Sequence, residues 1–147
     1  MNNQTINHVA VINASLSDFE LIKGFIKQFE LDNRELKNDE FLVAKQNNEL
    51  LGFGRVRQHN NCAELCSLGV VEPERLKGIG KRLVKELTNK SPNNLYLVCI
   101  IPDFFKPLGF TVVNQYPQAM QQKLDYCSSE LVVPETYVVM KYNASNT

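Results

Sequence analysis

A strand, a glycine-containing turn and a basic helix start follow one another in Leu68-Gly69-Val70-Val71-Glu72-Pro73-Glu74-Arg75-Leu76-Lys77-Gly78-Ile79-Gly80-Lys81. The first backbone N–H groups of a helix have no partner within it, and together with the aligned peptide dipoles they attract phosphate. Gly78 and Gly80 lack side chains that would block an approaching pyrophosphate. Arg75, Lys77 and Lys81 add positive charge. The stretch favours a nucleotide-like ligand; close packing of the helix on a sheet is the alternative reason for the glycines.

The patterns on either side of this stretch alternate between strand and helix. Strands are predicted at residues 8–13, 41–44, 50–58, 63–71, 95–100 and 136–142, with a further strand starting at Phe110. Helices are predicted after a capping box at Ser17-Asp18-Phe19-Glu20, after Asn33, over residues 79–87, around residues 103–106 and over residues 118–124. This mixed order, without a linker or an internal repeat, predicts a single domain over residues 1–147.

Charge and hydropathy exclude several classes of partner. Sixteen Lys and Arg residues balance sixteen Asp and Glu residues, so no net charge favours nucleic acid or an anionic membrane. No apolar run approaches the length needed to span a bilayer, and the polar start Met1-Asn2-Asn3-Gln4 lacks the features of a secretory signal. We therefore expect a cytoplasmic protein.

The cysteines and histidines do not indicate a metal site. Cys62 and Cys66 are expected on one strand, about 13 Å apart, which is too far for a disulfide. The four cysteines also lack the paired spacings of a zinc site, so no metal is expected. His59 lies among asparagines in a predicted exposed turn and His8 lies near the terminus, so neither is predicted to be catalytic.

Two spaced motifs resemble the signatures of one enzyme family. Arg75-Leu76-Lys77-Gly78-Ile79-Gly80 resembles the Arg/Gln-x-x-Gly-x-Gly/Ala signature of the GNAT acetyltransferases, and Phe104-Phe105-Lys106-Pro107-Leu108-Gly109-Phe110 resembles their Phe-Tyr-x-x-x-Gly-Phe signature. Residues 63–70 and 103–110 look closest to small bacterial proteins related to the acetyltransferase domain of N-acetylglutamate synthase. The resemblance implies an α/β (α+β) GNAT fold: a central mixed, mostly antiparallel sheet of six to seven strands, flanked by helices and splayed between strands four and five.

The resemblance also implies an activity and a set of cofactor contacts. Such an enzyme transfers an acetyl group from acetyl-CoA directly to a primary amine. The Leu68 N–H would polarise the thioester carbonyl, as in an oxyanion hole. The residues that the resemblance assigns to cofactor binding are Leu68, Val70, Arg75, Leu76, Lys77, Gly78, Ile79, Gly80, Lys81 and Phe105.

Glu64 is a lone carboxylate in an otherwise apolar strand, four residues before Leu68. Burial would raise its pKa towards neutrality. A glutamate at this place resembles the general base of the histone-modifying branch of the family, which takes a proton from the incoming ammonium. An exposed strand residue or a salt-bridge partner is the alternative interpretation.

Phe105 departs from the family pattern, because many relatives have a tyrosine whose hydroxyl protonates the departing thiolate. The general acid is therefore unassigned, with Tyr126 and Cys127 as candidates. The departure also motivates an alternative function, a sensor or interaction module that binds acyl-CoA without catalysis.

The acceptor amine is the least determined part of the prediction. The subfamily resemblance favours an amino acid, whose carboxylate would pair with Arg55 or Arg57 on the third strand. A solvated strand face is the alternative role for these arginines. Protein lysines and polyamines remain alternative acceptors. The strand at residues 136–142 has two alternative roles: it forms the interface of a homodimer, or it is buried within one monomer.

Overall fold

The computed structural model describes residues 8–71 and 78–144. These residues form seven strands, linked in the order β1-β2-β3-β4-β5-β7-β6. The strands are β1 (Ala10–Asn13), β2 (Phe41–Gln46), β3 (Glu49–Gln58), β4 (Ala63–Val70), β5 (Leu95–Cys99), β6 (Phe110–Val112) and β7 (Val138–Tyr142). The helices are α2 (Leu16–Phe29), α3 (Ile79–Lys90), α4 (Pro102–Phe105) and α5 (Gln118–Glu130), with 3-10 turns η1 (Asn38–Glu40) and η3 (Lys106–Leu108).

The strand pairing is mixed and mostly antiparallel, which confirms the predicted fold class. β1 with β2, β2 with β3, β5 with β7 and β6 with β7 are antiparallel, whereas β4 and β5 are parallel. The register of β4 with β5 covers two pairs, Ala63↔Leu95 and Glu64↔Tyr96, although β4 continues to Val70.

Contacts divide the chain into two compact units. The first comprises Met1–Arg55 and Ser67–Leu87, and the second comprises Val56–Cys66 and Thr88–Thr147. β3 and β4 each contribute residues to both units. Within the described residues, no helix has the length and apolar character needed to cross a membrane.

In the first unit, α2 begins two residues earlier than predicted. Ser15, not Ser17, caps the helix: its Oγ accepts from the Asp18 N–H at 3.1 Å, and the Asp18 carboxylate accepts from the Ser15 N–H at 3.0 Å. The predicted box at Ser17 is wrong because Ser15-x-x-Asp18 offers the same reciprocal bonds closer to the end of β1. Ile22 and Ile26 of α2 are buried, whereas Leu21, which shares their apolar pattern, is exposed.

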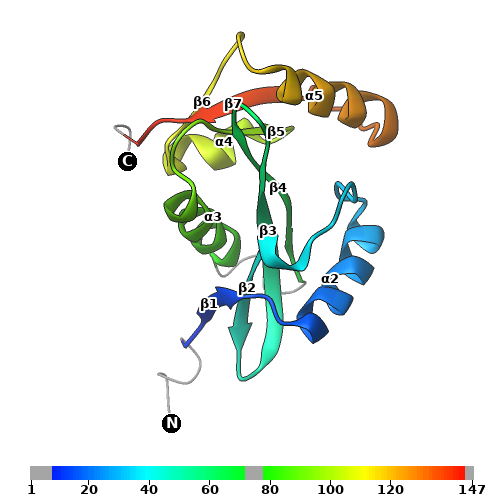
Figure 1. Cartoon of the computed structure of the whole chain (residues 1–147), viewed down its shortest axis with the longest axis vertical. Helices are drawn as coiled ribbons and strands as arrows, with labels where there is room; N and C mark the ends of the chain where they lie inside the picture. Colours follow the sequence, from blue (N-terminus) through cyan, green and yellow to red (C-terminus); the bar gives the residue numbers. More distant parts are fainter. Residues whose placement is uncertain (1–7, 72–77, 145–147) are drawn as a thin grey trace. The chain divides into compact units, whose positions relative to one another are not determined.

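The two faces of β3 in this unit are covered by different helices, α2 and α3 (Figure 1). Phe53 packs in a buried cluster that includes Ile26 of α2. Since side chains alternate along a strand, Gly52 and Gly54 face the other way. A Cβ at Gly54 would lie 2.9 Å from Leu87 of α3. The glycines therefore let α3 lie directly on the strand.

Substituting Gly69 tests a second close contact, between β4 and Phe53 of β3. A Cβ at Gly69 would lie 2.5 Å from the ring of Phe53, which is fully buried and cannot move cheaply. Gly69→Ala is therefore expected to cost about 1–3 kcal/mol of unfolding free energy, measured in urea. Gly24 is the matched control, because a Cβ there meets nothing within 4 Å on α2. Gly24→Ala should stabilise by about 0.4–1 kcal/mol. Equal effects at the two sites would contradict the packing.

The segment after Asn33 contains no helix of the predicted kind, only the 3-10 turn η1. Asp32 explains the difference. Its Oδ1 accepts from the backbone N–H of Arg34 at 3.0 Å, and its carboxylate also pairs with the Arg34 guanidinium. Such a local side-chain bond competes with helix formation.

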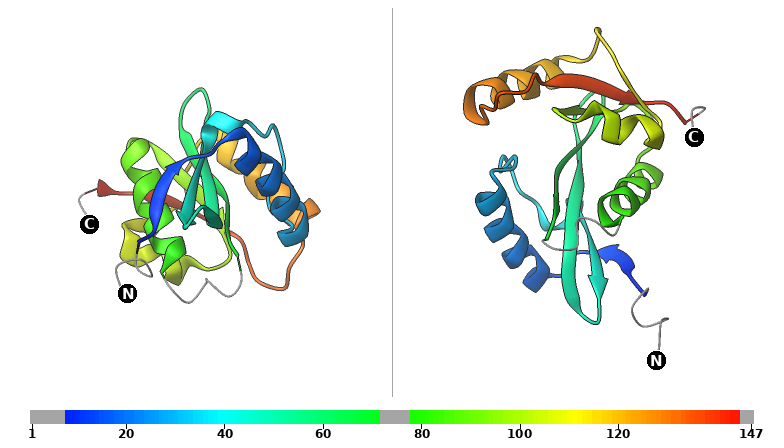
Figure 2. Two further views of the ribbon diagram at one scale, coloured as in Figure 1. Left: turned by 90° about the horizontal axis from the view of Figure 1, so that it is seen from below. Right: turned by 180° about the vertical axis from the view of Figure 1, so that it is seen from behind.

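In the second unit, α5 lies along β7 (Figures 1 and 2). A buried cluster joins Met120 of α5 to Cys62, to Tyr96 of β5 and to Val139 of β7. The helix runs to Glu130, six residues beyond the predicted end at Leu124. Its buried positions are Met120, Lys123 and Cys127, so one lysine lies on an otherwise apolar stripe.

Candidate active site

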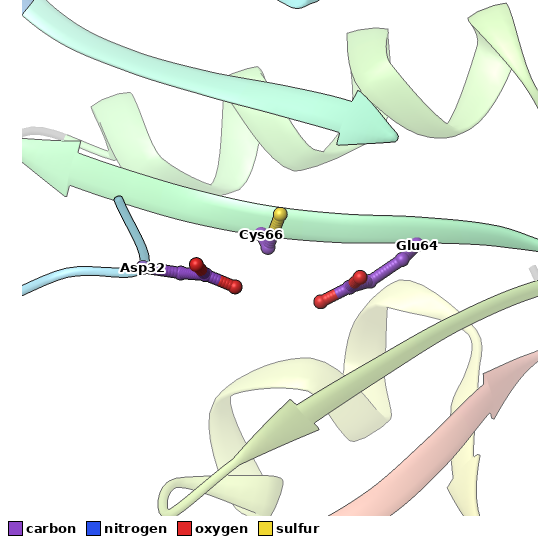
Figure 3. A group of neighbouring side chains, drawn as sticks. All are labelled: Asp32, Glu64 and Cys66. Atoms are coloured by element: carbon purple, nitrogen blue, oxygen red, sulfur yellow. The ribbon is translucent and has the colours of Figure 1, made fainter. Parts of the chain in front are cut away.

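Glu64 is fully buried on β4 in the second unit. Figure 3 shows it on the same strand as Cys66, two residues on; alternation along the strand places both on one face. Its carboxylate contacts three basic side chains: Lys123 Nζ lies 2.8 Å from Oε2, His59 Nε2 lies 2.9 Å from Oε1, and Arg57 Nη1 lies 3.9 Å from Oε1. Glu64 therefore forms salt bridges, which is one of the two alternatives to a catalytic role. The other alternative, an exposed strand residue, is excluded because Glu64 is fully buried.

The balance of charge around Glu64 favours its ionised form. Burial penalises a charged carboxylate, but two permanent cations oppose that penalty at short range. Lys123 is itself almost fully buried, which makes the pair mutually dependent: either charge would be costly without the other. A carboxylate in this state can accept a proton and is surrounded by groups that favour its release.

His59 lies in a different environment from the predicted exposed turn. A backbone bond from the His59 N–H to the Cys62 carbonyl, at 2.8 Å, closes the turn before β4. The ring then returns onto the strand and contacts Glu64, with 22% of the side chain still exposed. The sequence reasoning missed His59 and Lys123. A histidine five residues before a buried glutamate, across a tight turn, was the available signal, together with a lysine on the apolar stripe of α5.

Arg55 and Arg57 do not form the solvated strand face that was one of the predicted alternatives, since both are buried. The Arg55 guanidinium donates to Ser67 Oγ, Glu40 Oε1 and the backbone carbonyls of Arg34 and Glu35, at 2.9–3.2 Å. Three of these bonds join β3 to the segment before β2 in the first unit, and the bond to Ser67 joins β3 to β4. Arg55 thus stabilises the fold and has little capacity left for a ligand, whereas Arg57 lies beside Glu64.

The peptide that precedes Leu68 is turned out of regular strand geometry. Ser67 has a φ of 54° within β4, which is the left-handed region. Its Oγ donates to the Asp32 carbonyl at 2.8 Å and accepts from Arg55, and these bonds hold the conformation. Leu68 and Val70 are half-buried.

The start of α3 is open around Gly78. This residue has a φ of 75°, and a Cβ there would meet nothing within 4 Å. Among the described residues, the first bond of the helix runs from the Arg82 N–H to the Gly78 carbonyl at 3.1 Å. The N–H groups of residues 79–81 lie in the first turn, before this bond. Gly80 and Lys81 are partly or fully exposed and Ile79 is buried, whereas the predicted ligands Arg75, Leu76 and Lys77 lie outside the described residues.

Comparison with known proteins decides the family. The model of the Acetyltransferase (GNAT) family matches residues 9–110, more than half of the chain. The chain belongs to this family. An uncharacterized N-acetyltransferase of Chlorobaculum tepidum is 26% identical to this GNAT chain over 145 residues, which cover 88% of the chain and 94% of the relative. The chain is therefore an N-acetyltransferase with acetyl-CoA as co-substrate.

Solved structures share the fold of this GNAT acetyltransferase. The protein Rv2747 of Mycobacterium tuberculosis, in complex with CoA, has a TM-score of 0.73 and 18% identity, over 90% of this chain and 98% of its own. N-acetylglutamate synthase of Neisseria gonorrhoeae, complexed with coenzyme A and L-arginine, has a TM-score of 0.71 and 19% identity over 92% of this chain. The GNAT chain spans 33% of the length of that synthase chain.

Phe105 and the cysteines of this GNAT acetyltransferase are packing residues. Phe105 is buried against Phe104 and Phe110, with ring centroids 4.9 and 5.8 Å away. None of the four cysteines forms a disulfide, and all four are buried. Burial raises the pKa of the Cys99 thiol to about 11, and burial together with the Glu64 charge raises the pKa of Cys62. Both thiols therefore stay protonated near neutral pH and are poor nucleophiles.

Proposed function

We propose that this GNAT acetyltransferase transfers the acetyl group from acetyl-CoA directly to the primary amine of a small molecule, with Glu64 as the general base. The observation that carries the proposal is a fully buried carboxylate on β4, in contact with Lys123 and His59 and four residues before Leu68. We further propose that residues 1–147 act as one catalytic domain, because β3 and β4 run through both compact units.

The proposed cofactor contacts lie on β4 and at the start of α3. The pyrophosphate would bind the N–H groups that precede the ladder of α3, and the Gly78 conformation leaves room for it. The left-handed Ser67 backbone redirects the peptide leading to Leu68, whose N–H would donate to the thioester oxygen. The Val70 backbone would bind pantetheine.

Direct transfer is supported by the state of the thiols. A route through an acetylated enzyme needs an accessible nucleophile, and the four cysteines are buried. In the direct route the acceptor ammonium loses one proton to Glu64, and its nitrogen bonds to the acetyl carbon. The C–S bond then breaks, and the nitrogen releases its second proton to solvent as the neutral amide forms. The CoA thiolate then takes a proton from solvent, which does not require a tyrosine at residue 105.

An amino acid is the acceptor we propose. N-acetylglutamate synthase, with which the chain shares its fold, was solved with coenzyme A and N-acetyl-glutamate. Arg57, which lies beside Glu64, is the arginine we retain as partner for the acceptor's carboxylate. Arg55 is not retained, because its donors are occupied.

Release of free CoA thiol tests this function. Acetyl-CoA would be presented with amino acids, their decarboxylated amines, polyamines and lysine peptides. We expect turnover with one or more amino acids and a lower kcat/KM for the matching decarboxylated amine, because that amine cannot pair with Arg57. Equal rates for the two members of each pair would overturn the amino-acid assignment. Binding of acetyl-CoA without thiol release from any amine would support the sensor alternative.

A further inference from the structure

We propose that His59 takes the acceptor's proton from Glu64 and passes it to water in a polar pocket beside α5. The inference rests on the proposed role of Glu64 as the base and adds the route by which that base is regenerated. It makes His59 a relay residue whose ring does not need to touch the acceptor.

The geometry provides a short path from the interior to the surface. Glu64 is fully buried, and its Oε1 lies 2.9 Å from Nε2 of His59. His59, whose side chain is partly exposed, lines a pocket of about 270 Å³ that is also lined by Asn60, Gln118 and Gln122. These three polar side chains are exposed, so the pocket reaches solvent. The proton needs one hydrogen bond to cross from the buried carboxylate to a partly exposed ring.

Of the three basic side chains in contact with Glu64, His59 alone can accept a proton. The Lys123 ammonium and the Arg57 guanidinium are donors only. Both also favour the ionised carboxylate, so a proton on Glu64 would be short-lived. A neutral imidazole has a lone pair on one ring nitrogen, so Nε2 of His59 can accept that proton.

Within the second unit, the thiol and phenol groups near Glu64 do not offer a competing route. The Cys62 thiol, whose pKa is raised by burial and by the Glu64 charge, stays protonated. Cys66 lies on the same strand and is buried. Tyr96 is the neighbour of Glu64 in the β5 register and is also buried, under the cation of Lys141.

These contacts define the path of the acceptor's proton. The acceptor ammonium gives one proton to Glu64, and its nitrogen lone pair becomes free to form the bond to the acetyl carbon. The proton on Oε1 then moves to Nε2 of His59, in the tautomer that carries its own proton on Nδ1. Glu64 returns to carboxylate, and the resulting imidazolium loses one proton to water in the pocket.

Chemical rescue tests the relay. His59→Ala is expected to lower kcat by about 10²-fold, with little change in KM for acetyl-CoA, and added imidazole should restore part of the loss by occupying the vacated space. Gln121→Ala is the matched control: it is exposed on α5 outside the pocket lining, and should keep wild-type turnover with no response to imidazole.

The outcomes separate the relay from the base. Full turnover in His59→Ala, or a loss that imidazole does not restore in the folded variant, would overturn the relay while leaving Glu64 as the base. His59→Gln, which keeps a hydrogen bond to Glu64 but cannot carry the proton, should be as slow as His59→Ala; wild-type turnover in it would also overturn the relay. If Glu64→Gln keeps full turnover, the base and the relay fail together.

Discussion

The Glu64→Gln variant is expected to lose about 10²- to 10⁴-fold in kcat while it still binds acetyl-CoA. The amide has the same shape as the carboxylate but cannot take a proton from the acceptor ammonium. The proposed acetyl-CoA contacts, on β4 from Leu68 and at the start of α3, are not altered. Turnover should be measured by thiol release and acetyl-CoA affinity by calorimetry, on the same preparation.

Loss of the ion pair must be separated from loss of the base. Glu64→Gln leaves the buried Lys123 ammonium without its closest counter-charge, so some stability is lost as well. A urea titration would establish that the variant is folded under the assay conditions. Glu130→Gln, the same change at an exposed position on α5, should behave as wild type. A folded Glu64→Gln variant within about threefold of wild-type kcat would contradict the role of the base.

Arg55→Met is expected to lower the unfolding free energy by about 3–5 kcal/mol, because it leaves a buried network without its cation. Arg55 is fully buried and donates to Glu40, to Ser67 and to two backbone carbonyls. Methionine fills a similar volume, so the expected loss of unfolding free energy comes from the hydrogen-bond acceptors that lose Arg55 as their donor in the interior. Urea unfolding of both proteins gives the difference.

The same charge change at the surface is the control for Arg55. Lys23 pairs with Glu20 at 2.8 Å on α2, and both side chains are exposed. Lys23→Met should change the unfolding free energy by less than about 1 kcal/mol. If Arg55→Met were as mild as Lys23→Met, the structural assignment of Arg55 would be wrong, and its role as a ligand for the acceptor would return.

Local patterns predicted most of the fold. The apolar positions of α3 recur at helical spacing, and Ile79, Leu83, Val84 and Leu87 are all buried. Asn47 and Asn48 form the tight turn between β2 and β3, with φ of 52° and 66°. Spacing along one element determines these features, so a single sequence suffices. The compartment and the homodimer stay predictions.

The candidate site was predictable only in part, because its contacts depend on pairing between distant segments. Glu64 stood out as a lone charge in an apolar strand. Its partner Lys123 comes from α5, and that contact depends on how the helix packs, which local spacing does not determine. The solvated-face alternative for Arg55 and Arg57 was wrong for a related reason. β3 lies between β2 and β4, and buried strands do not show the alternation of a solvated face.

Mass spectrometry with acetyl-CoA labelled in its acetyl group tests the central claim most directly, since it follows that group to its destination. After incubation with the amine panel, the direct mechanism predicts the label on an amine, at a yield equal to the thiol released, with no label on the protein. Label held on the protein as an intermediate, or released only as acetate, would contradict direct transfer to an amine.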